Sequence, residues 1–212
     1  MPELPEVETI KRSLKINSGA KIKKIEIQRA DIIRRKDYEP FLLQNNTIKK
    51  IDRRGKYLAI IIEGGFNIIF HLGMSGRFYM LDEDLAVTDK HVHVIIYLDN
   101  GKKLIFQDPR RFGGVWFTDN LQKVLCNLGI EPLSKGFTRD YLAKITQNRK
   151  TPIKSLILNQ GLICGIGNIY ADEALFEAGI RPQKPAGGLS ADEIGNLWTA
   201  IRKVLRKGIR KR

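Results

Sequence analysis

The fold of this chain is decided by the stretch Tyr57-Leu58-Ala59-Ile60-Ile61-Ile62-Glu63-Gly64-Gly65, in which an apolar run meets a glycine pair. A short apolar run that ends in a glycine turn is typical of a strand that enters a hairpin. A second apolar run, Phe66 to Leu72, follows directly. The stretch therefore predicts a β-hairpin inside a β-rich region.

Outward from this hairpin, further short strands follow at regular spacing, with Asp99-Asn100-Gly101 as another hairpin turn. We expect them at Ile22 to Ile27, Val92 to Leu98, Lys103 to Phe106 and Gly114 to Phe117. Many short strands with turn signals between them indicate a sandwich or barrel. Before them, Val7, Ile10 and Leu14 recur at helical spacing and predict a leading helix over Pro5 to Lys15.

After Pro132 the periodicity becomes helical to the end of the chain. The expected helices are Arg139 to Gln147, Pro152 to Asn159, Asn168 to Ala178 and Ala191 to about Lys207. Ser190 and Glu193 form a capping-box pattern before the last one. The fold class is therefore α+β: an N-terminal β-sandwich over 1–118, a linker over 119–135 and a helical domain over 136–212.

The charge of the chain points to a polyanionic partner. The 212 residues carry 37 Lys+Arg against 23 Asp+Glu, a net charge of +14. Such an excess attracts nucleic acid first and an anionic membrane second, while a surface that only aids solubility stays an alternative. The segment Met1-Pro2-Glu3-Leu4-Pro5-Glu6 is no signal peptide and no apolar run has membrane-spanning length, so we expect a cytoplasmic, nucleoid-associated protein.

Cys126 and Cys164 are the only cysteines, and they form no CxxC pair. This excludes a disulfide framework and a zinc cage of thiolates. Cys164 lies in an apolar run and is expected to be buried. His91 and His93 alternate along an expected strand, but without a third ligand they predict no metal site.

Pro2 and Glu3 are the first candidates for chemistry. Once Met1 is removed, Pro2 is a terminal secondary amine, which can attack an electrophilic sugar carbon and form an iminium. A neighbouring carboxylate such as Glu3 could move protons. The alternative is purely structural: prolines begin helices, and acids in the first turn complement the helix dipole.

Five stretches carry a resemblance to a known family. They are Met1-Pro2-Glu3-Leu4-Pro5-Glu6-Val7-Glu8-Thr9, Arg54-Gly55-Lys56-Tyr57-Leu58, His71-Leu72-Gly73-Met74-Ser75-Gly76, Asp108-Pro109-Arg110-Arg111-Phe112-Gly113, and Gly165-Ile166-Gly167-Asn168-Ile169-Tyr170-Ala171-Asp172-Glu173-Ala174-Leu175-Phe176. In type and order they resemble the formamidopyrimidine-DNA glycosylases, over residues 1 to about 205. The resemblance implies that the helical domain contains a helix–two-turn–helix.

The resemblance also assigns roles to residues. It implies catalytic roles for Pro2, Glu3 and Lys56, with Lys56 contacting the phosphate or base near the lesion. It implies DNA-binding roles for Glu6, His71, Met74, Arg110, Phe112, Lys154 and Asn168. Enzymes that act on a base extrude it from the stack, and inserted side chains fill the space. Met74, Arg110 and Phe112 would be that trio, and Lys154 and Asn168 would clamp phosphates, with His71 as a further phosphate contact.

Each assignment has a plainer alternative. Lys56 could be a solvated turn lysine, Phe112 a core aromatic and Met74 a gap-filler. The turn Gly165-Ile166-Gly167-Asn168 precedes a helix, where backbone N–H groups could bind phosphate. It is no dinucleotide fingerprint, because Tyr170 stands where a third glycine is needed.

The family also has a loop that covers the extruded base and a four-cysteine zinc finger, and neither follows Arg212 in this sequence. We therefore expect no zinc and no cofactor, and weaker DNA binding; a truncated chain and a naturally short homologue are both open. The terminal basic run Arg206-Lys207-Gly208-Ile209-Arg210-Lys211-Arg212 could be a solvated tail or a phosphate contact.

The predicted function is a monomeric DNA glycosylase and AP lyase of base excision repair. It would remove oxidised purines from duplex DNA held in a basic cleft between the domains, through a Schiff base on Pro2 and β,δ-elimination. The alternatives are a relative resembling endonuclease VIII that prefers oxidised pyrimidines, and a catalytically impaired module that binds damaged DNA. A dinucleotide-binding enzyme is a distant third.

Overall fold

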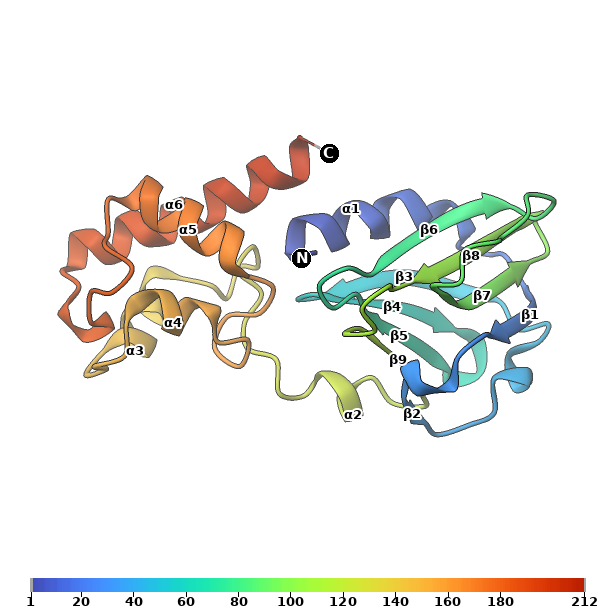
Figure 1. Ribbon diagram of the computed structural model, residues 1–212. Coiled ribbons are helices and arrows are strands. Elements are labelled where there is room, and N and C mark those ends of the chain that lie inside the picture. Colours follow the sequence, from blue (N-terminus) through green and yellow to red (C-terminus); the bar gives the residue numbers. More distant parts are fainter. Residues whose placement is uncertain (1, 212) are drawn as a thin grey trace. The chain divides into compact units, whose positions relative to one another are not determined.

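The computed structural model describes residues 2–211, and the chain divides into two compact units (Figure 1). Unit 1 contains Pro2 and Val7–Cys126, and unit 2 contains Glu3–Glu6 and the chain from Asn127 on. The division along the sequence falls within residues 119–135, but the first turn of the leading helix belongs to unit 2. Met1 and Arg212, which begin the N-terminal signature and end the basic run, lie outside the described residues.

Unit 1 is built from nine strands in two sheets. One sheet has the order β1-β7-β8-β6 and the other β2-β9-β5-β4-β3. Their bounds are β1 Ile22–Ile27, β2 Ile33–Lys36, β3 Ile48–Arg54, β4 Tyr57–Ile62, β5 Asn67–His71, β6 Arg77–Asp82, β7 Val92–Leu98, β8 Lys102–Gln107 and β9 Gly114–Thr118. All neighbours are antiparallel except β2 and β9, which are parallel.

The two sheets pack face to face around one apolar core. Phe70 on β5 contacts Phe78 on β6 and Phe106 on β8, with ring centroids 4.5 and 5.5 Å apart, so side chains of both sheets interdigitate. Val7 and Leu14 of the leading helix α1 (Leu4–Leu14) are buried in the same core. The predicted β-sandwich with a leading helix is confirmed.

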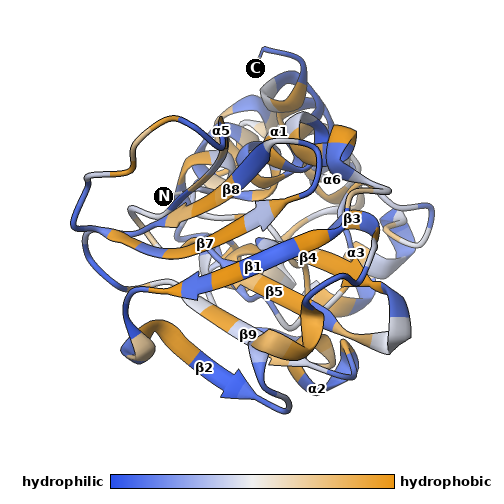
Figure 2. Ribbon diagram, turned by 90° about the vertical axis from the view of Figure 1, so that its right-hand side faces the viewer, coloured by the Kyte–Doolittle hydropathy of each residue, from blue (hydrophilic) through white to orange (hydrophobic). Residues whose placement is uncertain are grey.

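The sequence reading missed β2, β3 and β6. All three lie at the edge of a sheet. Edge strands often carry charged side chains that discourage pairing with other chains, and in β2 and β3 these charges hide the strand pattern. In Figure 2, β2 begins apolar at Ile33 and turns hydrophilic toward Lys36, whereas β5 is largely apolar.

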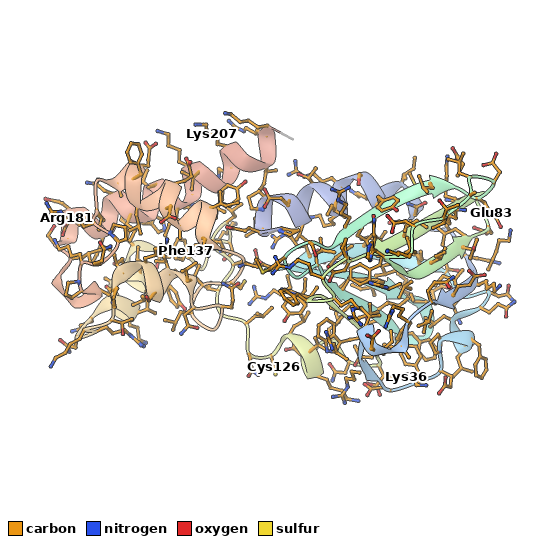
Figure 3. The ribbon with its side chains drawn as sticks, viewed as in Figure 1. Lys36, Glu83, Cys126, Phe137, Arg181 and Lys207 are labelled. Carbon is orange, nitrogen blue, oxygen red and sulfur yellow. The ribbon has the colours of Figure 1, made fainter. Side chains whose placement is uncertain are left out.

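Unit 2 is helical. Its helices are α3 Arg139–Thr146, α4 Ile153–Leu158, α5 Asn168–Ala178 and α6 Ala191–Arg210; the short α2, Gln122–Leu125, precedes the unit. Ser190 and Glu193 cap α6 in the predicted capping box. Phe137, labelled in Figure 3, is buried in the core of the unit.

Residues 127–135, taken as linker from the sequence, belong to this unit, and Ile130 and Leu133 pack against its core. Leu4, from the first turn of α1, is buried there as well. Within residues 2–211, none of the helices combines the length and the apolar character that crossing a membrane requires.

Candidate functional site

Glu3 is the best-anchored side chain of the candidate site. It is fully buried, and its carboxylate sits at the N-terminus of α5. Oε2 accepts hydrogen bonds from the backbone N–H of Gly167 at 2.6 Å and of Tyr170 at 3.3 Å, and Oε1 accepts one from Ile169 at 2.9 Å. The first N–H groups of a helix lack partners within the helix, and a negative side chain there is stabilising. Glu3 thus caps a helix about 165 residues further along the chain.

The glycines before α5 make room for this anchor. A Cβ at Gly167 would lie 2.4 Å from Cδ of Glu3. Gly165 has φ +92° and its Cβ would lie 2.8 Å from side-chain atoms of Leu4, whose backbone N–H donates to the Gly165 carbonyl at 3.0 Å. The prediction that the N–H groups of this turn bind phosphate is therefore wrong for Gly167, Ile169 and Tyr170, because Glu3 occupies them. No local sequence pattern indicates this pairing.

Glu6 forms hydrogen bonds with both partners of this contact, Glu3 and Tyr170. Its Oε2 accepts from the backbone N–H of Glu3 at 2.8 Å, and its Oε1 accepts from the Tyr170 hydroxyl at 3.0 Å. Gly208 on α6 lets that hydroxyl approach, since a Cβ there would lie 2.3 Å from it. The structure places Glu6 in this network, and its DNA-binding role stays a prediction. Pro2, half-buried, is the residue directly before the anchored Glu3.

Lys56 and His71 lie at one end of the five-stranded sheet. Lys56 is in the β3–β4 turn, where Gly55 has φ +56°, and Tyr57 pairs with His71 across β4 and β5. Burial lowers the pKa of His71, and the charge of Lys56 lowers it further. The imidazole Nδ1 accepts from the Gly73 N–H at 3.2 Å. The neutral ring therefore carries its proton on Nε2, which makes His71 a hydrogen-bond donor for a phosphate oxygen.

Two loops of unit 1, β5–β6 and β8–β9, are tied together through the buried Asp108. Its carboxylate accepts from the Ser75 hydroxyl at 2.6 Å and from the Gly113 N–H at 2.8 Å. The two loops also meet without room for side chains, because a Cβ at Gly73 would lie 2.5 Å from the backbone nitrogen of Gly113. From the other side, Nε2 of His93 lies 2.8 Å from the Asp108 carbonyl oxygen.

These joined loops present the three predicted wedge residues. Met74 is 46% exposed and Phe112 56% exposed, so neither is a core residue or a gap-filler. The Arg110 guanidinium lies over the Phe112 ring, 4.5 Å from its centroid. An exposed methionine and an exposed aromatic, held on loops braced by a buried carboxylate, suit insertion into a base stack. Asp108 and Ser75 lie within two of the motifs, but their residue types alone indicate no role.

Lys154 and Asn168 lie on adjacent helices of unit 2. Nζ of Lys154 on α4 forms an ion pair with Asp172 on α5 at 2.7 Å. Asn168 is exposed at the first position of α5 and precedes Asp172 by one turn, so the two share a face. Lys154 and Asn168 therefore both lie on the side of α5 that carries Asp172, and their phosphate contact stays a prediction.

The two cysteines lie in different units. Cys126 is exposed in unit 1, and Cys164 is buried in unit 2 with its Sγ 3.5 Å from Glu131 Oε1. Between residues 2 and 211, no three His, Cys, Asp or Glu side chains are grouped to hold a metal.

The fold is therefore a β-sandwich followed by a helical unit, with exposed Met74, Arg110 and Phe112 on two joined loops of the sandwich. The model described as formamidopyrimidine-DNA glycosylase N-terminal domain matches residues 1–115, and the model of the H2TH domain of the same glycosylase matches residues 128–212. The chain therefore belongs to the formamidopyrimidine-DNA glycosylase family, and the sequence-based recognition of this family is confirmed.

Individual relatives agree with this assignment. The formamidopyrimidine-DNA glycosylase of Syntrophomonas wolfei is 52% identical over 212 residues, which is 100% of this chain and 79% of that protein. The enzyme of Rickettsia africae is 48% identical over 216 residues, 99% of this chain and 78% of its own. A crystal structure of the Lactococcus lactis protein with DNA containing FAPY-dG has a TM-score of 0.91 at 34% identity and covers 98% of this chain and 80% of that one.

Proposed function

We propose that this protein is a base-excision repair DNA glycosylase and AP lyase that removes oxidised purines, 8-oxoguanine and formamidopyrimidines, from duplex DNA. The observation that carries the proposal is the pair of loops braced by Asp108, which exposes Met74, Arg110 and Phe112 together. Such side chains fill the stack when a base is extruded for chemistry. The solved Lactococcus lactis relatives are complexes with DNA that contains FAPY-dG or an abasic site.

The proposed nucleophile is the secondary amine of Pro2, which exists once Met1 has been removed. The amine attacks C1′ of the damaged nucleotide; an N–C1′ bond forms, and the bond between C1′ and the base breaks. The base leaves with a proton. The nitrogen lone pair then expels O4′, which takes up a proton, so that the C1′–O4′ bond breaks and the opened sugar is held as an iminium. Elimination of the 3′ phosphate and then of the 5′ phosphate cuts the strand on both sides.

Glu3 and Lys56 serve this reaction in different ways. Glu3 adjoins the nucleophile and handles the proton of the departing base; its three bonds to α5 hold the N-terminal segment in place. Lys56 contributes a cation beside His71 at the end of the sheet. The nucleophile is the chain's own amine, so the proposed reaction requires neither zinc nor another cofactor.

DNA binding is assigned to two sets of residues. His71 and Lys56 contact the backbone from unit 1, and Lys154 and Asn168 from unit 2. We place the protein, as a monomer, on the DNA of the cytoplasmic nucleoid.

Borohydride trapping tests the proposal. The protein is incubated with three duplexes that carry 8-oxoguanine opposite cytosine, thymine glycol opposite adenine, or an abasic site. We expect adducts with the first and third. An adduct with thymine glycol but not 8-oxoguanine would favour an enzyme similar to endonuclease VIII. Binding without an adduct on any duplex would contradict catalysis and leave a damaged-DNA-binding module.

A further inference from the structure

The C-terminal half of α6 carries two parallel rows of cations. The rows are Arg202, Arg206 and Arg210, and Lys203, Lys207 and Lys211, of which Lys211 directly follows the helix. Neighbours within a row are four residues apart, which spaces them by about 6 Å along the helix. The rows line an open groove of about 560 Å³ that begins at Trp198 and Thr199. Figure 3 shows the Lys207 side chain projecting outward from α6.

Little in unit 2 neutralises these charges. Lys203 pairs with Glu177 on α5 at 2.5 Å, and Arg202 donates to the carbonyls of Pro132 and Ser134 at 3.2 and 3.0 Å. Within the described part of the chain, the other four cations of the rows form no ion pair and no side-chain hydrogen bond. Both acidic residues of α6 lie in its first turn.

The arrangement works against the stability of the helix. Like charges four residues apart repel, and both rows consist of such pairs. Burial lowers the pKa of Arg202, and the nearby charge of Arg206 lowers it further. The helix dipole favours cations only in the last turn, so it accounts for Arg210 and Lys211 but not for Arg202 and Lys203. An anionic partner would relieve the repulsion along the whole groove.

This surface is separate from the predicted phosphate contact on α4 and α5. Lys154 pairs with Asp172, whereas Lys203 pairs with Glu177. At 100° per residue, Glu177 points about 140° away from Asp172 around α5. The two cations therefore approach α5 from different sides.

The groove offers little that would bind a protein partner specifically. Its aromatic residue, Trp198, already donates its Nε1–H to the Phe137 carbonyl at 2.7 Å. The guanidinium groups of Arg139 and Arg202 lie 5.4 and 5.1 Å from its ring centroid. What remains open is a row of charges, which suits the repeated phosphates of a nucleic-acid backbone and contributes affinity without sequence preference.

We propose that the double cation row of α6 is a second DNA-binding surface, which holds the phosphodiester backbone of another duplex segment while the lesion site is occupied. It goes beyond the glycosylase function proposed above. A second non-specific contact lets a protein pass between segments of DNA without full dissociation.

The test compares two triple variants of the full chain. One combines Arg206→Gln, Arg210→Gln and Lys211→Gln. The control combines Lys15→Gln, Lys49→Gln and Lys90→Gln, which removes the same charge from exposed positions of unit 1. Each protein is trapped with borohydride on a short abasic duplex, and the purified adduct is titrated with a second, undamaged fluorescent duplex between 50 and 200 mM salt.

We expect the control adduct to bind the second duplex, and its affinity to fall about 40-fold more over this salt range than that of the α6 variant, if each removed cation contacts one phosphate. Equal affinities and equal salt slopes, or no binding of a second duplex by the control adduct, would overturn the proposal. Tighter binding of poly-L-glutamate than of duplex would overturn the assignment to nucleic acid. If no adduct forms, the glycosylase proposal fails instead, and the same titration of the free variants still decides the role of α6.

Discussion

Gly167→Ala tests whether the N-terminal segment is fixed by α5. The new Cβ would lie 2.4 Å from Cδ and 2.5 Å from Oε1 of Glu3, so the carboxylate must leave the helix N-terminus. Two of its hydrogen bonds, at 2.6 and 2.9 Å, have the length of strong bonds to a charged group, and we estimate the free energy from these two alone. At the lower end of about 1.5 to 3 kcal/mol for each bond to a charged group, their loss costs about 3 kcal/mol.

The assay is urea unfolding together with the rate of borohydride trapping on an abasic duplex. Gly188→Ala is the matched control in the same unit, because a Cβ there meets nothing within 4 Å. We expect the control to change the unfolding free energy by at most about 1 kcal/mol. We expect Gly167→Ala to lose about 3 kcal/mol and to trap more slowly, because Pro2 adjoins the displaced Glu3. Equal unfolding curves and equal trapping rates for the two variants would refute the anchor.

Three further predictions concern unit 1. Phe112→Ala should change stability by less than about 0.5 kcal/mol, because the ring is 56% exposed, while 8-oxoguanine excision in single-turnover kinetics falls strongly; unchanged excision would contradict the wedge role. Asp108→Ala should lower the unfolding free energy by about 2 to 4 kcal/mol, because the Gly113 N–H and the Ser75 hydroxyl both lose their acceptor. The same variant should slow the excision of 8-oxoguanine more than it slows trapping on an abasic site. An equal effect on both rates would argue against a role of Asp108 in holding the loops that carry Met74, Arg110 and Phe112. The pKa of His71 lies below its ordinary value, so its contribution to stability is complete above about pH 6.5 and is lost as pH falls toward the folded pKa. In an NMR titration, Lys56→Gln should raise the His71 midpoint only part of the way, since burial is the larger cause; a midpoint at the ordinary value in the unaltered protein would contradict this account.

The parts of the fold that the sequence predicted are those with strong local signals. The glycine pair after β4 and the turn Asp99-Asn100-Gly101 mark hairpins, and the capping box of Ser190 and Glu193 marks the start of α6. The edge strands β2 and β3 escaped because charged side chains interrupt their apolar positions, whereas β6, Arg77–Asp82, carries charges only at its two ends. Prediction from local sequence fails where an edge strand carries more charged side chains than buried apolar ones.

The candidate site was predictable in composition but not in its long-range contacts. The motifs marked Met74, Arg110 and Phe112 for exposure, and the structure exposes them on one pair of loops. The bond between Glu3 and Gly167 joins residues 164 positions apart, and nothing local to either residue indicates it. For that reason the glycine turn before α5 was interpreted as a phosphate site.

The identity of the nucleophile is the central claim, and mapping a trapped adduct tests it most directly. The protein, with Met1 removed, is reduced with borohydride on an abasic duplex, digested, and analysed by mass spectrometry. The account predicts that the sugar remnant is on the nitrogen of Pro2, and that protein retaining Met1 forms no such adduct. A remnant on Lys56 or on another lysine would contradict it.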